Sequence, residues 1–131
     1  MKKRNILFGC ALLFLSCATR PTANKPTTHI QFSTDQHDFG TFHTQTEQRC
    51  AFVFKNTGKN MLAIHRVETD CGCTTAEGPR MPVKPGAVDS IVVRYDGNGF
   101  LPGSFRKVIS VYSNATDTLI QLSIKGTYYP E

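Results

Sequence analysis

The stretch QRCAFVFKN, residues 48–56, alternates between two faces. Cys50, Phe52 and Phe54 share one face, and the residues between them share the other. An apolar period of two is typical of a β-strand with one buried face, because successive side chains point to opposite sides of a sheet. The stretch therefore predicts a half-buried strand, and the same apolar period can be looked for in the rest of the chain.

The same period recurs from residue 29 onward. It is found in HIQFS (29–33), MLAIHRV (61–67), DSIVVRYDG (89–97), SFRKVISVYSN (104–114) and TLIQLSIKG (118–126). Turn-forming Gly, Pro and Asn residues stand between these stretches, for example in DFG at 38–40 and NTGKN at 56–60. About seven short strands in about 100 residues predict an all-β domain, a single immunoglobulin-like antiparallel β-sandwich.

The first residues have the three-part pattern of a secretion signal. Basic MKKRN is followed by the apolar run 6–15 and then by Ser16 and Cys17. About ten apolar residues are too few to span a bilayer core of roughly 30 Å as a helix, so we expect a signal peptide rather than a transmembrane anchor. The boundary LFLSC is similar to a bacterial lipobox, although Phe14 stands where leucine is usual. The alternative is an ordinary secretion signal that happens to contain a cysteine.

These features predict a lipid-anchored protein. Residues 1–16 would be removed, and Cys17 would carry several acyl chains, which together anchor a protein stably. Residues 17–29 would form the lipidated cysteine and a flexible tether, because ATRPTANKPTTH at 18–29 is small, polar and rich in proline. The sandwich would cover 30–127, followed by a C-terminal tail at 128–131. Because residue 18 is Ala rather than an inner-membrane retention Asp, we expect the outer membrane of the cell envelope, facing the periplasm.

The charge gives no support to nucleic-acid binding. The formal net charge is +5, but Lys2, Lys3 and Arg4 supply three of the 15 basic residues. The remaining 12 basic residues are opposed by 10 acidic residues, so the mature part carries only about +2. We therefore expect no nucleic-acid partner.

The order of several motifs resembles the one-five-seven-three domain-of-unknown-function family. The motifs, which cover roughly residues 30–127, are HDFGTF, FVFKNTG, LAIHRVETDCGCTT, VKPG, IVVRYDGNG, GSFRKVISVYSNA and LSIKGT. This resemblance implies an immunoglobulin-like fold, similar to domains of the major-sperm-protein and Hydin type. It also implies a bacterial lipoprotein, and it implies no activity.

No residue pattern points to catalysis. The chain has neither a GxSxG nor an HExxH pattern, and three of its four histidines lie in the polar N-terminal third. We expect no enzyme, no catalytic residues and no cofactor. A small sandwich without such patterns is typically a binding or scaffolding module that uses its loop ends or a strand edge, and its partner here would be an envelope protein of unknown identity. The pairs Phe100–Leu101 and Tyr128–Tyr129 would either form a contact patch or plug the ends of the core.

The alternative function is a thiol-redox or metal-handling periplasmic protein that uses Cys50, Cys71 and Cys73. A hairpin of strands 50–56 and 61–67 would bring Cys50 near the stretch DCGCT. Four states remain open: a bond from Cys50 to Cys71 or Cys73, a strained Cys71–Cys73 ring, a copper or zinc site with His65 as a further ligand, and free thiols with Gly72 turning the backbone. We expect a disulfide, with the bond to Cys50 favoured over the ring, and no metal.

Two tripeptides resemble the Asp-Ser/Thr-apolar acceptor of periplasmic O-glycosylation in some bacteria. They are DTL at 117–119 and DSI at 89–91. Thr118 follows a turn signal and is the candidate acceptor, whereas Ser90 falls inside a predicted strand. A three-residue pattern is weakly specific, so an unmodified strand start is the alternative.

Overall fold

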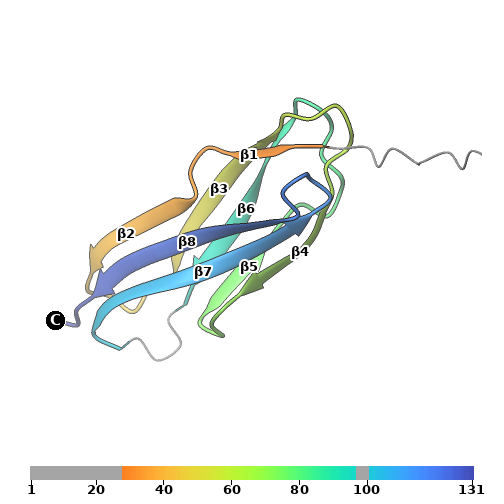
Figure 1. Cartoon of the computed structure of the whole chain (residues 1–131). Coiled ribbons are helices and arrows are strands. Elements are labelled where there is room, and N and C mark those ends of the chain that lie inside the picture. Colours follow the sequence, from red (N-terminus) through yellow and green to blue (C-terminus); the bar gives the residue numbers. More distant parts are fainter. Residues whose placement is uncertain (1–27, 97–100) are drawn as a thin grey trace, which may run out of the picture.

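The computed structural model describes residues 28–96 and 101–131. The predicted signal peptide, Cys17, Phe100 and most of the predicted tether therefore lie outside the described residues. Within these ranges the chain forms eight strands, and no helix of the described residues could cross a membrane. The all-β sandwich expected from the apolar period is confirmed, with eight strands in place of about seven (Figure 1).

Two four-stranded sheets form the sandwich. The first sheet has the order β1 (Ile30–Phe32), β3 (Gln48–Asn56), β6 (Val88–Tyr95), β5 (Thr74–Glu77). The second has the order β2 (Gln36–Phe42), β8 (Leu119–Tyr128), β7 (Gly103–Ser113), β4 (Ile64–Thr69). The expectation of an antiparallel sandwich needs one correction, because β2 pairs with β8 in parallel. The chain passes from one sheet to the other on both lateral sides, between β1 and β2 and between β4 and β5.

The strand directions divide the loops between two ends of the molecule. The end that contains Thr28 and the loops 57–63 and 114–118 is named the tether end. The opposite end, which contains the β4–β5 turn at 70–73 and the C-terminus, is named the corner end (Figure 1). Any group at the corner end is therefore separated from the chain's entry point by the length of the strands.

The core lies between the inward faces of the two sheets. Every strand that was predicted from its apolar period turns its apolar face inward, and the central side chains are at most 1% exposed. They are Phe52, Phe54, Ile91 and Val93 from the first sheet, and Ile109, Val111, Leu122 and Ile124 from the second. Complete burial of such a side chain is worth roughly 1.5–3 kcal/mol, so this layer dominates the stability of the domain.

A buried polar cluster closes the tether end. The Thr28 hydroxyl donates to Asn56 Oδ1 at 2.8 Å, and Asn56 Nδ2 donates to the carbonyl oxygens of Asn60 and Val83 at 2.8 and 2.9 Å. The Gly58 amide donates to Asn56 Oδ1 at 3.0 Å. Both Thr28 and Asn56 have no exposed surface, so the predicted tether must be shortened: the folded domain already includes Thr28.

Two strands were missed, β2 because its sequence carries a breaker residue and β5 because it is short. The tripeptide 38–40, predicted as a turn, is a bulge inside β2, where the pairing with β8 shifts register between Asp38 and Thr41. Gly40 has a φ of 67°, and its amide donates to Asp38 Oδ1 at 2.8 Å. A bulge with glycine in the left-handed region looks like a turn in sequence. β5 has only four residues, directly after the CGC stretch, and its sequence shows no apolar alternation.

The predicted hairpin of 50–56 with 61–67 is wrong. The turn NTGKN exists, but it leads from one sheet to the other: β3 pairs with β6, and β4 pairs with β7. Leu62 of this connection instead forms an isolated antiparallel bridge with Val83 of the β5–β6 connection, and Leu62 is completely buried. A turn signal shows where a chain reverses but does not fix which strand becomes the neighbour, and this error carries over to the predicted cysteine pairing.

Candidate functional site

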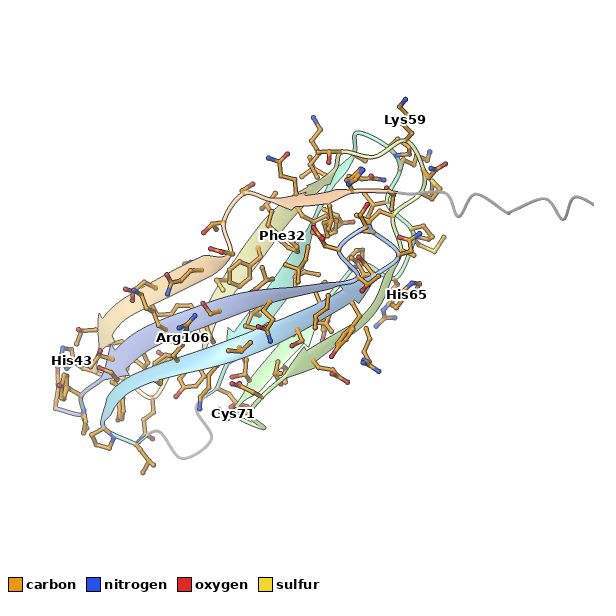
Figure 2. The ribbon with its side chains drawn as sticks, viewed as in Figure 1. Phe32, His43, Lys59, His65, Cys71 and Arg106 are labelled. Atoms are coloured by element: carbon orange, nitrogen blue, oxygen red, sulfur yellow. A yellow bond between two sulfur atoms is a disulfide. The ribbon has the colours of Figure 1, made fainter. Side chains whose placement is uncertain are left out.

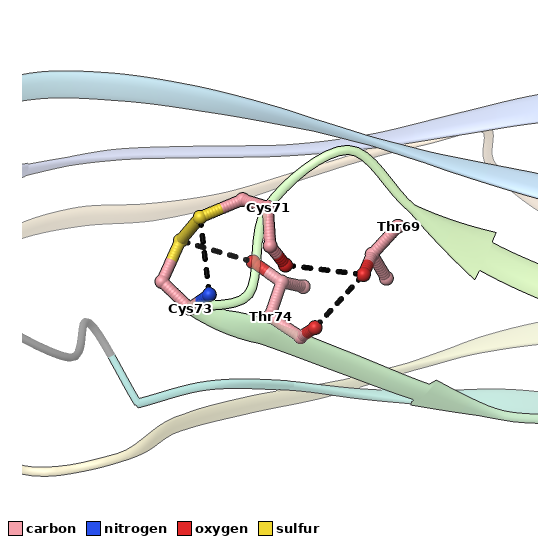
Figure 3. The surroundings of a disulfide bond; sticks show 4 residues. All are labelled: Thr69, Cys71, Cys73 and Thr74. Atoms are coloured by element: carbon pink, nitrogen blue, oxygen red, sulfur yellow. Dashed lines mark hydrogen bonds between the residues drawn. A yellow bond between two sulfur atoms is a disulfide. The ribbon is translucent and has the colours of Figure 1, made fainter.

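The β4–β5 turn at the corner end is built by hydrogen bonds from Thr69 and Thr74. The Thr69 hydroxyl lies 2.9 Å from the Thr74 carbonyl oxygen and 3.2 Å from that of Cys71, in a bifurcated arrangement (Figure 3). The Thr74 amide donates to the Cys71 carbonyl at 3.2 Å. The turn is thus braced from the inside, on the side away from the sulfur atoms.

The disulfide of the corner joins Cys71 to Cys73 across Gly72, with a Cα–Cα distance of 5.2 Å. The backbone N–H of Cys73 donates to Cys71 Sγ at 3.1 Å. Gly72 does not have a positive φ, and a Cβ built on it would contact nothing within 4 Å. Of the four open states, the ring is the one present, and the backbone of this turn does not require glycine.

The favoured pairing of Cys50 is therefore corrected. Cys50 carries a free thiol and lies half-buried on the inward face of β3. Its cross-strand partner is Val93, which in turn faces Ala76 of β5, so all of β6 lies between Cys50 and the CGC strand. Two strand spacings amount to about 10 Å, whereas a disulfide needs Cα atoms within about 7 Å. Desolvation raises the pKa of the Cys50 thiol to about 11.

The four candidate metal ligands are not brought together. Cys71 and Cys73 are joined to each other, Cys50 lies two strands away, and His65 sits at the opposite end of β4 from Cys71 (Figure 2). Within 28–96 and 101–131, no group of three or more His, Cys, Asp or Glu residues could hold a metal ion. The described geometry therefore gives the metal-handling alternative no ligand set.

A groove lies where the edge strands β4 and β5 face each other. Its volume is about 260 Å³, and its lining runs along 64–67 and 76–80. A Cβ on Gly78 would lie 3.1 Å from Ile91 Cδ1 and 3.2 Å from Ile64 Cγ2, so the backbone here rests directly on core side chains. No sequence signal identifies this groove, because the apolar period does not tell which strands are edges.

The walls of the groove carry charged side chains of both signs. Arg66 Nε lies 3.0 Å from Glu68 Oε1, and its guanidinium stacks 4.1 Å over the ring of Tyr112. Glu77 and Arg80, both exposed, line the other wall. The Arg66 head group thus has two partners, and its positive charge is paired with the Glu68 carboxylate.

The remaining candidates are dispersed over the sandwich. Thr118 is exposed in the β7–β8 connection at the tether end, and Ser90 lies inside β6. Tyr128 is 3% exposed and belongs to the core, which agrees with the expectation that such residues close the ends of the core. Tyr129 and Leu101, in contrast, are 53% and 84% exposed. Tyr128 also belongs to β8, so the predicted tail at 128–131 begins one residue too early.

Comparison with known proteins identifies one family model. The model described as "Protein of unknown function (DUF1573)" matches residues 30–128, nearly all of the sandwich. No curated protein matches the sequence at a significant level. The match therefore covers the folded domain and brings no assigned activity with it.

Solved structures show the same sandwich. A protein of unknown function from Porphyromonas gingivalis W83 superposes with a TM-score of 0.69 at 21% identity, covering 83% of this chain and 51% of its own. The PapD-like domain 7 of human CEP192 gives a TM-score of 0.65 at 9% identity, covering 89% and 96%. The periplasmic chaperone SfaE gives 0.54 at 11% identity, covering 79% and 58%. The chain thus spans about half of the bacterial protein of unknown function, and at these identities the likeness establishes the fold.

Proposed function

The chain belongs to the DUF1573 family of unknown function, and we propose that it is a cell-envelope lipoprotein whose immunoglobulin-like sandwich is a non-catalytic binding or scaffolding module. Cys17 is the proposed lipid anchor, in the outer membrane and facing the periplasm. The groove between the β4 and β5 edges is the proposed binding surface, and an extended segment of an envelope protein is the proposed ligand. The observation that carries the binding role is this groove between two strand edges.

Edge strands support this choice of ligand. Strand β5 has four residues and pairs only with β6, and β4 pairs only with β7, so each has one side without a neighbouring strand. A sheet edge offers backbone donors and acceptors in the row that an added strand needs, while neighbouring pockets select its side chains. The paired charges of Arg66 and Glu68 on one strand, with Glu77 and Arg80 on the other wall, favour a polar segment of mixed charge.

The short connection to the proposed anchor supports a module held near the membrane. Residues 18–27 lie between Cys17 and the buried Thr28, and a chain of this length spans at most about 40 Å. Because Thr28 is fixed in the polar cluster, the tether end would face the membrane. The corner end would then point away from it.

Site-specific photo-crosslinking tests the binding surface. A photoreactive amino acid replaces Arg80 in the groove, and in a matched control it replaces Lys55, which is exposed on β3 in the interior of the first sheet. In envelopes of the native host, the Arg80 position should give a defined adduct at least about tenfold stronger than the Lys55 position. Equal adducts at both positions, or none at Arg80, would contradict the groove as the binding surface.

Fatty-acid labelling tests the anchor separately. The unchanged protein should incorporate label, and the Cys17→Ser variant should lose it and be released from the membrane fraction. A Cys10→Ser variant is the matched control, because Cys10 lies within the apolar run that would be removed. Label that persists in the Cys17→Ser variant would show that the anchor is assigned to the wrong residue.

A further inference from the structure

The Cys71–Cys73 disulfide is a poor structural staple. It bridges residues only two apart in sequence, and the gain in stability from a cross-link falls as the closed loop shortens. The turn is also held without it: the Asp70 amide donates to the Val108 carbonyl at 3.3 Å and the Asp96 amide to the Cys73 carbonyl at 3.1 Å, in addition to the bonds from Thr69. The corner therefore has little structural need of the sulfur–sulfur bond.

The two sulfur atoms have different surroundings. Cys73 packs against the hydrophobic core and its Sγ lies 3.7 Å from Thr74 Oγ1, whereas Cys71 is not among the side chains packed on the core. Cys71 Sγ instead accepts the N–H of Cys73 at 3.1 Å. A hydrogen bond to sulfur stabilises the thiolate more than the thiol, so Cys71 is the cysteine that this turn prepares to carry negative charge.

The corner is also partly exposed to solvent. Gly72 is exposed between the two half-buried cysteines, and the sulfur atoms lie on the side of the turn away from Thr69 (Figure 3). The turn stands at the opposite end of the sandwich from Thr28, with the length of β4 in between. A small disulfide ring at an exposed turn is the kind that exchanges readily with thiols.

We propose that the Cys71–Cys73 disulfide is a thiol–disulfide exchange site for protein dithiols, with Cys71 forming the mixed disulfide and Cys73 resolving it. This activity does not depend on the proposed lipid anchor or on the β4–β5 groove. The domain would then carry out a redox reaction in addition to binding a partner.

The exchange balances in two steps. A substrate thiolate attacks Cys71 Sγ, the Cys71–Cys73 bond breaks, and Cys73 leaves with the electron pair and takes up a proton. The second substrate thiolate then attacks the substrate sulfur of the mixed disulfide and expels the Cys71 thiolate, which the Cys73 N–H stabilises. The substrate dithiol is oxidised to a disulfide, and the CGC pair is reduced to two thiols. In the reverse direction, the Cys71 thiolate attacks a substrate disulfide and expels one substrate thiolate. The Cys73 thiolate then attacks Cys71 Sγ, re-forms the Cys71–Cys73 bond and expels the second substrate thiolate.

The test uses the purified full-length protein with reduced, unfolded ribonuclease A as the dithiol. After acid quenching and alkylation of free thiols, the tryptic peptide 67–80 reports on Cys71 and Cys73, and the separate peptide 50–55 reports on Cys50. One disulfide should appear in ribonuclease for each CGC pair that becomes alkylated, while Cys50 stays unpaired. A CGC disulfide that remains intact, although dithiothreitol reduces it, would overturn the proposal.

Single-thiol variants test the roles of the two cysteines. In a Cys50→Ala background, Cys73→Ser leaves Cys71 as the CGC thiol, and Cys71→Ser leaves Cys73. With glutathione disulfide, the protein that retains Cys71 should form the mixed disulfide about tenfold faster. Rates within about twofold of each other would overturn the assignment. If a variant does not fold, the glutathione adduct is located in the unchanged protein by fragmenting peptide 67–80. An adduct mainly on Cys73 would likewise overturn the assignment of Cys71 as the cysteine that forms the mixed disulfide.

Discussion

The hydroxyl of Thr28 donates a 2.8 Å hydrogen bond to Asn56 Oδ1, and neither side chain has exposed surface. This contact ties the first described residue to the end of β3. It also leaves every polar atom of the Asn56 side chain with a partner, because the amide nitrogen donates to Asn60 and Val83. The cluster is therefore a place where one substitution removes several buried hydrogen bonds together.

Asn56→Ala should lower the free energy of unfolding by about 2–4 kcal/mol, because the Val83 and Asn60 carbonyls and the Gly58 amide each lose one hydrogen bond at a buried or half-buried site. Urea denaturation measures the change. Lys55→Ala, at the exposed position next to it, is the control and should stay within about 0.5 kcal/mol of the unchanged protein. Equal effects of the two substitutions would contradict the cluster's role.

Gly126→Ala should destabilise the domain by about 1–3 kcal/mol, because a Cβ there would lie 2.9 Å from Phe105 Cζ and 3.3 Å from the Gly40 carbonyl oxygen. The melting temperature, measured by circular dichroism, should fall accordingly. Gly72→Ala is the matched control: its Cβ would meet nothing within 4 Å, and its φ is not positive. A larger loss at Gly72 than at Gly126 would refute this account.

Cys50 should react slowly with iodoacetamide in the folded protein, because burial raises the pKa of its thiol from an ordinary value of 9.0 to about 11. Alkylation of peptide 50–55 should accelerate as the pH approaches 11, whereas in urea the acceleration should come near pH 9. The folded state holds this proton more tightly, so the contribution of Cys50 to stability is present below pH 9 and is lost as the pH rises to about 11. Coinciding pH profiles in buffer and in urea would contradict the shift.

If Thr118 is an O-glycosylation acceptor, protein from the native host should exceed the mass of the processed lipoprotein, and Thr118→Ala should remove much of the excess. The residue is exposed in the β7–β8 connection, where a modifying enzyme can reach it. Ser90→Ala is the control, since Ser90 lies inside β6 and pairs with Val53 of β3. Intact-mass spectrometry decides, and a mass without excess would rule the modification out.

The fold class was predictable because burial imposes its period on single strands. The apolar alternation of β3 and β6 predicted which side chains face inward, and these side chains are buried: Phe52, Phe54, Ile91 and Val93. Strand neighbours were not predictable in this way. The turn NTGKN looks the same whether the chain pairs with itself or crosses to the other sheet, and here it crosses.

The candidate site was predictable in part. The CGC stretch was recognised as a corner with a disulfide, but the partner assigned to it followed from the wrong hairpin, and β6 separates Cys50 from the pair that forms. The edge groove was not predicted, because Gly78 and Arg80 line a groove only when β4 and β5 lie side by side, and the sequence does not show that they do. Local composition carries information about turns, and it carries none about which distant strands become edges.

The parallel pairing of β2 with β8 has a mechanical consequence. The chain enters the sandwich at the tether end through β1 and leaves it at the corner end through β8. Opposed forces on its two ends therefore load the pairing of β1 with β3 first, and then pull β2 and β8 past each other along their length. Their hydrogen bonds run across the direction of pull and carry the load together, instead of opening one after another as in a peeled hairpin. Tension along this axis therefore loads the β2–β8 pairing in shear.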